Sequence, residues 1–578
     1  MKNKLTETGM IISVLIFAIG LAWAGEGQID IATLPYTINI SGSYIITRDI
    51  ALPTPDTNGI TINTDNITLD LNGHALIGQG QLTSSTGSGI FVNGTHYNIT
   101  IRNGTLRNWR ENGVRASESR NCQIEALRCY SNGDNGILAG YNSRISKNTC
   151  QSNSTSGIYA STGNTVIENI CSENAGDGII ASYGSIVSGN TCISNTGSGI
   201  YSQEGVTVSG NNCYSNTIAG IWVVSNSAVS GNTCTYNNGD GIQVSSNCRV
   251  TDNTSSNNGV GVTVGAGIHS VAQNNQIHNN TCVANDKGID LDAANNIISG
   301  NVLRGNTSTA VEAAANNQLD ILISELPYTI LYSGMYRLTG ALYLASTNTH
   351  GITIDADDVT LDLNGHVLNG PGKAAGSSGA GIYVNGFQYH IVIRNGNVRD
   401  WRGCGIDAHL AADGRFENLQ CFNNGEDGLN VGAGNIVSGN NCLANANNGI
   451  YTGGSCRISG NNCHSNGVDG IYTANSRVIG NYCRSNTGDG IEVSGDCQVR
   501  DNECFENGSG VGDGAGIHVT YVGDNTIENN MVTDNDRGID VDVAGNYIAS
   551  NRASGNSTDY DIVGGNTQGA GDLANVSF

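Results

Sequence analysis

A repeat of 21 residues is the feature of this chain that most restricts its fold. A glycine followed by isoleucine returns every 21 residues, at Gly136, Gly157, Gly178, Gly199, Gly220 and Gly241. A cysteine precedes each of these glycines by seven residues, and an asparagine follows each cysteine by three. Three columns in constant register indicate that each turn of chain stacks on the turn before it, as in a solenoid.

The residues within one repeat favour strands over helices. Short alternating segments such as Gly157–Ser161 leave room in 21 residues for two or three strands joined by tight bends. Stacking at strand spacing, about 4.8 Å, pairs every strand in parallel with its neighbours above and below. Asparagine suits the bends because it tolerates left-handed backbone conformations, and stacked amides can hydrogen-bond along a column. The sequence therefore predicts an all-β parallel solenoid.

The pattern also repeats on a larger scale. Residues 59–74 (GITINTDNITLDLNGH) return at 351–366 (GITIDADDVTLDLNGH), an offset of 292. Residues 287–292 return at 537–542, an offset of 250. The two offsets differ by 42 residues, which is two coils, so the second copy is predicted to lack two turns from its middle.

We therefore predict two tandem β-helix copies, 25–317 and 318–578. Each copy opens with a less regular segment, 31–51 in the first and 321–344 in the second. An uncovered first coil would invite addition of a further strand. These two segments are predicted to be caps that cover that edge.

The first residues are typical of a secretory signal peptide. Lys2 and Lys4 precede an apolar run, and Ala22 and Ala24 form a small-x-small cleavage pattern. We expect residues 1–24 to be removed and the mature chain to be extracytoplasmic: secreted, periplasmic or at the cell surface. No other stretch approaches the length of a membrane span, so no membrane insertion is expected after removal of the signal.

The charge balance restricts the partners. Fifty acidic residues against 26 basic ones give a net charge of −24. Such a surface repels polyanions, which makes nucleic acid a poor partner and disfavours unassisted binding of an acidic polysaccharide. A bound divalent cation would reverse that repulsion locally.

Several motifs resemble those of right-handed parallel β-helix repeat proteins in the pectate-lyase-like superfamily. They are LDLNGH at 69–74 and 361–366, IRNG at 101–104 and 393–396, and the run of SGN-x-C-x-x-N-x-x-x-G-I coils. The resemblance covers nearly all of the mature chain. It implies a right-handed parallel β-helix. It implies little about function, because the group includes polysaccharide lyases, hydrolases, uronate epimerases and binding or adhesive modules without chemistry.

The catalytic signatures of that superfamily are not found in the sequence. A polygalacturonase-like site needs Gly-His-Gly, but His74 and His366 are followed by Ala75 and Val367. The Asp-Pro-His of alginate epimerases and the basic cluster of lyases are also missing from the sequence. Whether the protein is an enzyme is left open.

The cysteines are predicted to be buried and reduced. Their column is occupied in other coils by Leu106, Leu303, Val398 and Met531, which marks it as apolar and inward-facing. Stacked Cβ atoms would lie about 4.8 Å apart, farther than the ~3.8 Å that a disulfide prefers. Cys122, Cys248, Cys456 and Cys497 lie off this column, and isolated pairs that involve them stay open.

The residue after each Gly-Ile pair is expected to point outward, because side chains alternate along a strand. In both copies this outward column runs from aromatic to ionisable residues. Flat aromatic rings suit sugars, which gives substrate-binding candidates Tyr159, Tyr201, Trp222, Tyr451 and Tyr472. The ionisable end gives catalytic candidates His269, Asp290, Glu492, His518 and Asp540. Carboxylates stacked at this end could share calcium, with Asp290, Asp292, Asp540 and Asp542 as candidate ligands.

The leading functional hypothesis is an extracytoplasmic β-helix that binds a polysaccharide or other glycan along this outward column. A second hypothesis is a rigid structural or adhesive module, whose outward residues only keep the surface soluble. A third is a polysaccharide-modifying enzyme of the lyase, hydrolase or epimerase type. Calcium is the only cofactor that the sequence suggests.

Overall fold

The computed structural model describes residues 27–53, 56–80, 86–260, 265–346, 348–373, 379–508 and 514–578. The predicted signal peptide lies outside these residues. Within them the chain is a parallel β-solenoid from β1 (Ile29–Ile31) to β67 (Val576–Ser577), with one short 3₁₀ helix, η1 (Gly571–Leu573). This architecture confirms the predicted fold class. No described helix is long and apolar enough to cross a membrane.

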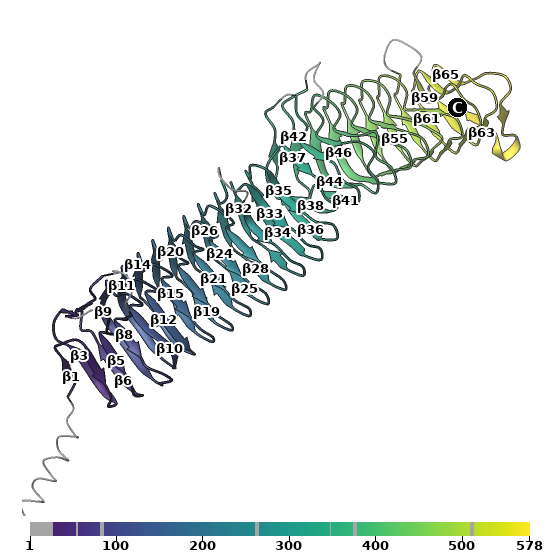
Figure 1. The fold of residues 1–578 in the computed structure, drawn as a ribbon. Helices are drawn as coiled ribbons and strands as arrows, with labels where there is room; N and C mark the ends of the chain where they lie inside the picture. The colour runs from purple at the N-terminus through teal and green to yellow at the C-terminus, as the bar shows by residue number, and fades with distance from the viewer. Residues whose placement is uncertain are drawn as a thin grey trace, which may run out of the picture. The chain divides into compact units, whose positions relative to one another are not determined.

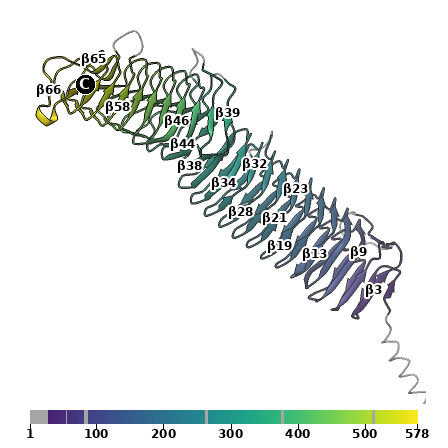
Figure 2. The same cartoon turned by 180° about the vertical axis from the view of Figure 1, so that it is seen from behind.

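Two compact units make up the described chain. The first unit comprises the residues up to Asn296 together with Gly305–Asn316, and the second comprises Ile297–Arg304 together with Asn317–Phe578. Within each unit, the corresponding strands of successive coils lie side by side (Figure 1; Figure 2). The descent of the chain from two tandem copies, 25–317 and 318–578, stays a prediction.

One sheet in the first unit carries the outward column. In the described residues it has 13 parallel strands in this order: β2 (Tyr36–Ile38), β5 (Ile60–Ile62), β8 (Ile90–Val92), β10 (Val114–Arg120), β12 (Ile137–Tyr141), β15 (Ile158–Ala160), β18 (Ile179–Ala181), β21 (Ile200–Ser202), β24 (Ile221–Val223), β27 (Ile242–Val244), β30 (Ala266–Ser270), β33 (Lys287–Leu291) and β35 (Thr309–Ala313). The strands on the other sides of the coils pair in the same way, as β16 (Thr165–Ile167) does with β19 (Ile186–Ser188).

The equivalent sheet of the second unit has 11 parallel strands among the described residues. Their order is β37 (Tyr328–Ile330), β40 (Ile352–Ile354), β43 (Ile382–Val384), β45 (Ile406–Ala408), β47 (Leu429–Val431), β50 (Ile450–Thr452), β53 (Ile471–Ala474), β56 (Ile491–Ser494), β59 (Ala515–Val519), β62 (Arg537–Val541) and β65 (Thr558–Ile562). In both sheets, one residue of each strand points into the core and the next points away from it.

The core is a stack of small apolar side chains, one set per coil. Ile158, Ala160, Val166 and Cys171 of one coil are all fully buried. All 17 cysteines are free and buried, those off the main column included. Leu106 stacks in register on Cys129, which places the two in one apolar column. These observations confirm the prediction of buried thiols without disulfides. Met531 does not belong to this column as expected: it is exposed, and Val532 takes the place beside Cys504.

Buried asparagines form hydrogen-bonded ladders along the solenoid. The amide nitrogen of Asn153 donates to Oδ1 of Asn174 at 2.9 Å and to the carbonyl of Cys129 at 3.1 Å. The left-handed bend, however, is at the residue before each ladder asparagine, such as Ser152 (φ 51°) and Glu173 (φ 55°). Our assignment of that conformation to the asparagines was wrong. Their role is to satisfy the backbone of the bend from inside, which requires the amide and not the left-handed φ.

The repeated glycine is required by close packing against this ladder. A Cβ atom on Gly178 would lie 2.5 Å from the carbonyl oxygen of Gly199 and 2.9 Å from Nδ2 of Asn195. Neither the backbone nor the buried amide can yield easily, because each is held by the coil stacked on it. Glycine, asparagine and cysteine therefore recur together as one packing unit.

The segment predicted as the second cap begins with an interior strand. In the second unit, β36 (Gln318–Ile323) pairs with β34 (Ile297–Arg304) on one side and with β38 (Gly334–Leu338) on the other. The strand that contains Ile321 therefore has a parallel neighbour at each edge. The first predicted cap, 31–51, contributes β3 (Gly42–Ile46), which likewise pairs with β1 and with β6 (Ile67–Asp70).

Candidate functional site

Strand register places the outward residues of each sheet in one continuous column, which we call the strip. In the first unit Tyr159, Ile180, Tyr201 and Trp222 stack on consecutive strands, followed by Gln243, His269, Asp290 and Glu312. In the second unit Tyr451, Tyr472, Glu492, His518, Asp540 and Asp561 do the same. In both units an aromatic pair ends two strands before the histidine.

The two aromatic pairs have different geometries. Tyr201 and Trp222 meet edge to face, with ring centroids 5.3 Å apart and an interplanar angle of 82°. Tyr451 and Tyr472 are parallel, with centroids 4.9 Å apart and an angle of 3°. Each tyrosine of the parallel pair therefore covers one face of its neighbour, and a sugar can approach only the remaining faces and the edges. Tyr159 lies apart from both pairs, two strands before Tyr201.

His269 lies between two carboxylates in the first unit. Its Nδ1 is 2.9 Å from Oδ2 of Asp240, and its Nε2 is 3.0 Å from Oδ2 of Asp292. The other carboxylate oxygen of Asp240 accepts a hydrogen bond from the backbone N–H of Ala266 at 2.7 Å. Asp240 is thereby fixed to the same strand as the imidazole, which it orients toward Asp292.

His518 has the same surroundings in the second unit. Its Nδ1 is 2.9 Å from Oδ2 of Asp489, and its Nε2 is 3.2 Å from Asp542 and 3.7 Å from Asp540. The backbone N–H of Ala515 donates to the second oxygen of Asp489 at 2.5 Å. We refer to these two arrangements as the Asp–His–Asp groups.

Both imidazoles are charged at neutral pH. Burial opposes the charged form, but the hydrogen bonds to Asp240 and Asp292 and the negative charges of Asp240 and Asp290 outweigh it and raise the pKa of His269 to about 9. Asp489, Asp542 and Asp540 outweigh burial in the same way and raise the pKa of His518 to about 9. Each histidine is therefore an imidazolium held between carboxylates.

Asp290 and Asp540, which follow the histidines in the strip, are buried, although the sequence pattern predicted that their side chains are exposed to solvent. Asp540 and Asp290 are only 1% and 8% exposed. Nζ of Lys287 lies 2.6 Å from Oδ2 of Asp290, and Arg537 contacts Asp540 in the same way. The basic side chain folds back over the strand and covers the carboxylate. Asp292 and Asp542, in contrast, keep about half of their side chains exposed.

Sequence reasoning missed the residues that complete these groups. Asp240 and Asp489 stand directly before the repeated glycine, a position that we did not examine as a column. Lys287 and Arg537 begin the repeated K/R-G-I-D-x-D motif, of which the sequence pattern marked only the aspartates as candidates. The shared motif, together with an acid before the glycine, is the signal that could have found them.

The second unit carries two additional acids beside its group. Asp469, Asp489 and Glu492 have carboxylate oxygens within 4.8 Å of one another. Burial and the charge of Asp489 raise the pKa of Asp469 to about 7. At the corresponding strand positions the first unit has Ala219 and Gln243, so the two sites differ in charge.

Each Asp–His–Asp group has ligand atoms that could hold a cation. In each unit the histidine and the two aspartates that follow it place one ligand atom each within 4.8 Å of the others. These residues are His269, Asp290 and Asp292 in the first unit, and His518, Asp540 and Asp542 in the second. Several carboxylate oxygens suit an oxygen-preferring divalent cation, and the Nε2 atom of the histidine can join them once it gives up its proton.

Comparison with solved structures gives β-helix proteins at low identity. The A-module of mannuronan C-5 epimerase AlgE4 from Azotobacter vinelandii is 14% identical, over 51% of this chain and 91% of that chain, with a TM-score of 0.34. The Dettilon tailspike protein is 18% identical over 50% of this chain and 61% of that chain (TM-score 0.36). The periplasmic alginate epimerase AlgG is 12% identical over 64% and 79% (TM-score 0.23). Among curated proteins no match was found.

Residues 221–405 match a family described as periplasmic copper-binding protein (NosD). That stretch contains the first Asp–His–Asp group. The soft sulfur ligands that select copper(I) do not occur in this group, and the cysteines of the chain are buried in the core. The residues present therefore do not fit a copper(I) centre.

A second family accounts for most of the repeats. The family described as right handed beta helix region matches residues 88–234, 380–513 and 448–571, which together span more than half of the chain. The match agrees with the parallel solenoid and its coils of 21 residues, and it gives the right-handed sense that the resemblance implied. The chain belongs to the right-handed beta helix family.

Proposed function

We propose that this protein is an extracytoplasmic β-helix that binds a glycan along the strip. The observation that carries the proposal is that both units place an aromatic pair on the same outward column as an Asp–His–Asp group, two strands away from its histidine. Two strand spacings amount to about 10 Å, which is the reach of a few linked sugar rings. The match of residues 221–405 to a periplasmic family supports the location.

The chemistry of the strip suits hydroxyl-rich ligands. Aromatic rings offer apolar contact to the C–H face of a sugar, and the carboxylates accept hydrogen bonds from its hydroxyls. The net charge of −24 disfavours acidic chains unless a cation mediates. A neutral glycan is therefore the proposed partner.

A polysaccharide-modifying enzyme is the second candidate, and the Asp–His–Asp groups favour it. An imidazolium oriented by one carboxylate and facing another has a proton to donate at Nε2. In both units this proton faces a half-exposed aspartate at the end of the strip.

The test is a glycan array probed with the full chain and three double variants. Tyr201→Ala with Trp222→Ala and Tyr451→Ala with Tyr472→Ala remove the two pairs. Tyr214→Ala with Tyr236→Ala is the matched control, because these exposed rings form an edge-to-face pair outside the strip. We expect each strip variant to lose at least about tenfold in affinity, roughly 1.4 kcal/mol, and the control to bind as the parent does. A parent that binds no glycan, or strip variants that bind unchanged, would overturn the proposal.

A further inference from the structure

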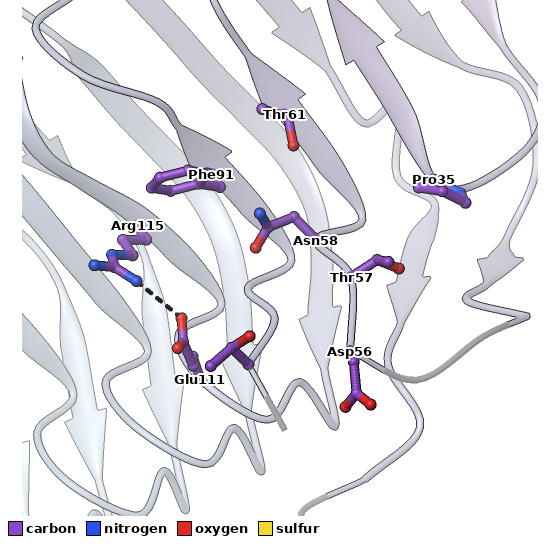
Figure 3. Close-up of a pocket in the computed structure, with 9 residues that line it drawn as sticks. Pro35, Asp56, Thr57, Asn58, Thr61, Phe91, Glu111 and Arg115 are labelled. Atoms are coloured by element: carbon purple, nitrogen blue, oxygen red, sulfur yellow. Dashed lines mark hydrogen bonds and ion pairs between the residues drawn. The ribbon is translucent and has the colours of Figure 1, made fainter. Parts of the chain in front are cut away.

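A cavity of about 600 Å³ opens on the first coils of the first unit. Figure 3 shows its lining: the ring of Phe91, the guanidinium of Arg115 and the carboxylate of Glu111 surround one side. Asn58 and Thr61 are among the other residues that line it. Its volume lies within the range of small-molecule sites.

The cavity belongs to the same strip as the aromatic pair. Thr61, Phe91 and Arg115 are consecutive outward residues on β5, β8 and β10, in register with one another. Arg115 stacks in turn on Leu138 and Leu138 on Tyr159. A glycan that lies along the strip therefore reaches this cavity without leaving the sheet.

The charges in the cavity compensate one another. The guanidinium of Arg115 lies 3.1 Å from Oε2 of Glu111 and 5.2 Å from the centroid of the Phe91 ring. At the rim, Asp56 lies 3.5 Å from Arg110. The lining thus has no excess positive charge to attract a uronate or a phosphate.

The polar groups of the cavity offer both donors and acceptors. Oδ1 of Asn58 accepts a hydrogen bond from the backbone N–H of Ser88 at 2.9 Å, which fixes the amide. The hydroxyl of Ser88 donates to Oε2 of Glu111 at 3.2 Å, so the carboxylate is held in place as well. Fixed donors and acceptors around one aromatic ring are what recognition of sugar hydroxyls requires.

The second unit has different chemistry at the same strand positions. Tyr383 and Asp407 are in register on β43 and β45, at the places of Phe91 and Arg115. The ring of His350 stacks on Tyr383 at 4.2 Å and 13°. With the offset of 292, Glu111 corresponds to Gly403, so the ion pair is specific to the first unit.

We propose that this cavity is a subsite for a neutral sugar unit of the bound glycan, and that it gives the first unit a preference that the second unit lacks. The inference rests on the proposed function. It adds to that function a position for binding, the chemical class of the ligand, and a difference in ligand preference between the two units.

The experiment uses the full chain and two sets of immobilised linear oligosaccharides, neutral hexoses and oligomannuronate. Phe91→Ala removes the ring, and Glu111→Gln leaves Arg115 without its compensating charge. Tyr236→Ala, an exposed aromatic position outside the strip, is the control. Melting temperatures establish that each variant is folded, and Glu111→Gln tests the cavity even if Phe91→Ala fails to fold.

We expect Phe91→Ala to weaken binding of the neutral set at least about tenfold. Glu111→Gln should weaken the neutral set and strengthen oligomannuronate binding at low salt, because the exposed cation is no longer neutralised. If both variants bind as the parent does while Tyr201→Ala with Trp222→Ala loses affinity, the cavity is not a subsite but the strip still binds glycan. A parent that prefers oligomannuronate also overturns the subsite, and a parent that binds no glycan overturns both proposals.

Discussion

His518 and Asp489 are joined by a hydrogen bond of 2.9 Å, and His269 and Asp240 repeat it in the first unit. In each case the carboxylate also accepts a backbone N–H from the strand that carries the histidine. The imidazole is therefore fixed in orientation and in charge. This fixation has a consequence for stability as well as for binding.

We expect the two histidines to make stability depend on pH. Their pKa is raised from 6.5 to about 9 in the folded protein, so their contribution is complete below pH 6.5 and is lost as the pH rises through 9. Each unit of pKa is worth about 1.4 kcal/mol, and partial exposure reduces this, so we expect on the order of 2 kcal/mol per site.

The measurement compares melting temperatures of the parent and of His518→Gln between pH 6 and 9.5. The difference between them should be largest at the acid end and should shrink toward pH 9.5. A difference that is constant or grows with pH would show that the imidazole is not held as a cation.

Breaking one asparagine ladder should destabilise the solenoid strongly. Nδ2 of Asn190 donates to the carbonyl of Val166 and to Asn211, and its Oδ1 accepts from the backbone and amide of Asn169. Asn190→Ala leaves these buried groups without partners, which costs about 2–4 kcal/mol. Denaturation midpoints measure this, with the exposed Asn212→Ala on the next coil as control. Equal midpoints for the two variants would contradict a structural role for the ladder.

The fold could be predicted because each of its packing requirements restricts the same position in every 21-residue repeat. Gly178 must lack a side chain beside the carbonyl of Gly199, and Cys171 must be small and apolar. Each requirement applies equally in every coil, so the sequence shows it as a column.

The Asp–His–Asp groups could be predicted only in part because they occur once per unit. The column containing His518 and Asp540 was recognised, but Asp489 and Arg537 stand directly before a repeated glycine, a position that most other coils fill with Asn, Ser, Ala or Asp. Burial of Asp540 depends on where the Arg537 side chain folds, which no periodicity encodes.

The thiols should react only after unfolding. All 17 are free and buried, so a reagent cannot reach them in the native protein, and burial also raises the pKa of the Cys282 thiol to about 12. We expect almost no reaction with a thiol reagent at pH 8 and about 17 equivalents in denaturant without reductant. A much lower count in denaturant would indicate disulfides.

The stability of a fragment that contains the second unit should depend on the residue at which the fragment begins. A fragment 318–578 exposes the edge of β36 that pairs with β34, whereas a fragment 297–578 retains this pairing. We expect the longer fragment to melt higher, because it keeps the backbone hydrogen bonds between β34 and β36. Melting temperatures compare the two. If neither fragment folds while 25–317 and the full chain do, the second unit is not an independent copy.

Calcium binding tests whether the Asp–His–Asp groups also hold a cation. Asp292 and Asp542 are half-exposed and lie within reach of a buried aspartate and an imidazole nitrogen, so a cation could bridge them. We expect calcium to raise the melting temperature of the parent, and Asp292→Asn and Asp542→Asn each to remove part of the effect. At tenfold excess over Kd each site contributes about 1.4 kcal/mol.

The controls for calcium are Asp252→Asn and Asp501→Asn, which change exposed aspartates outside the groups. They remove the same charge from the surface but should keep the full calcium response. Manganese and copper(II), tested in parallel, distinguish an oxygen-preferring site from one dominated by the imidazole nitrogen. If none of the three ions changes the melting temperature of the parent, the carboxylates are fully occupied in ion pairs with His269, His518, Lys287 and Arg537. The ends of the strip would then act through these fixed ion pairs alone.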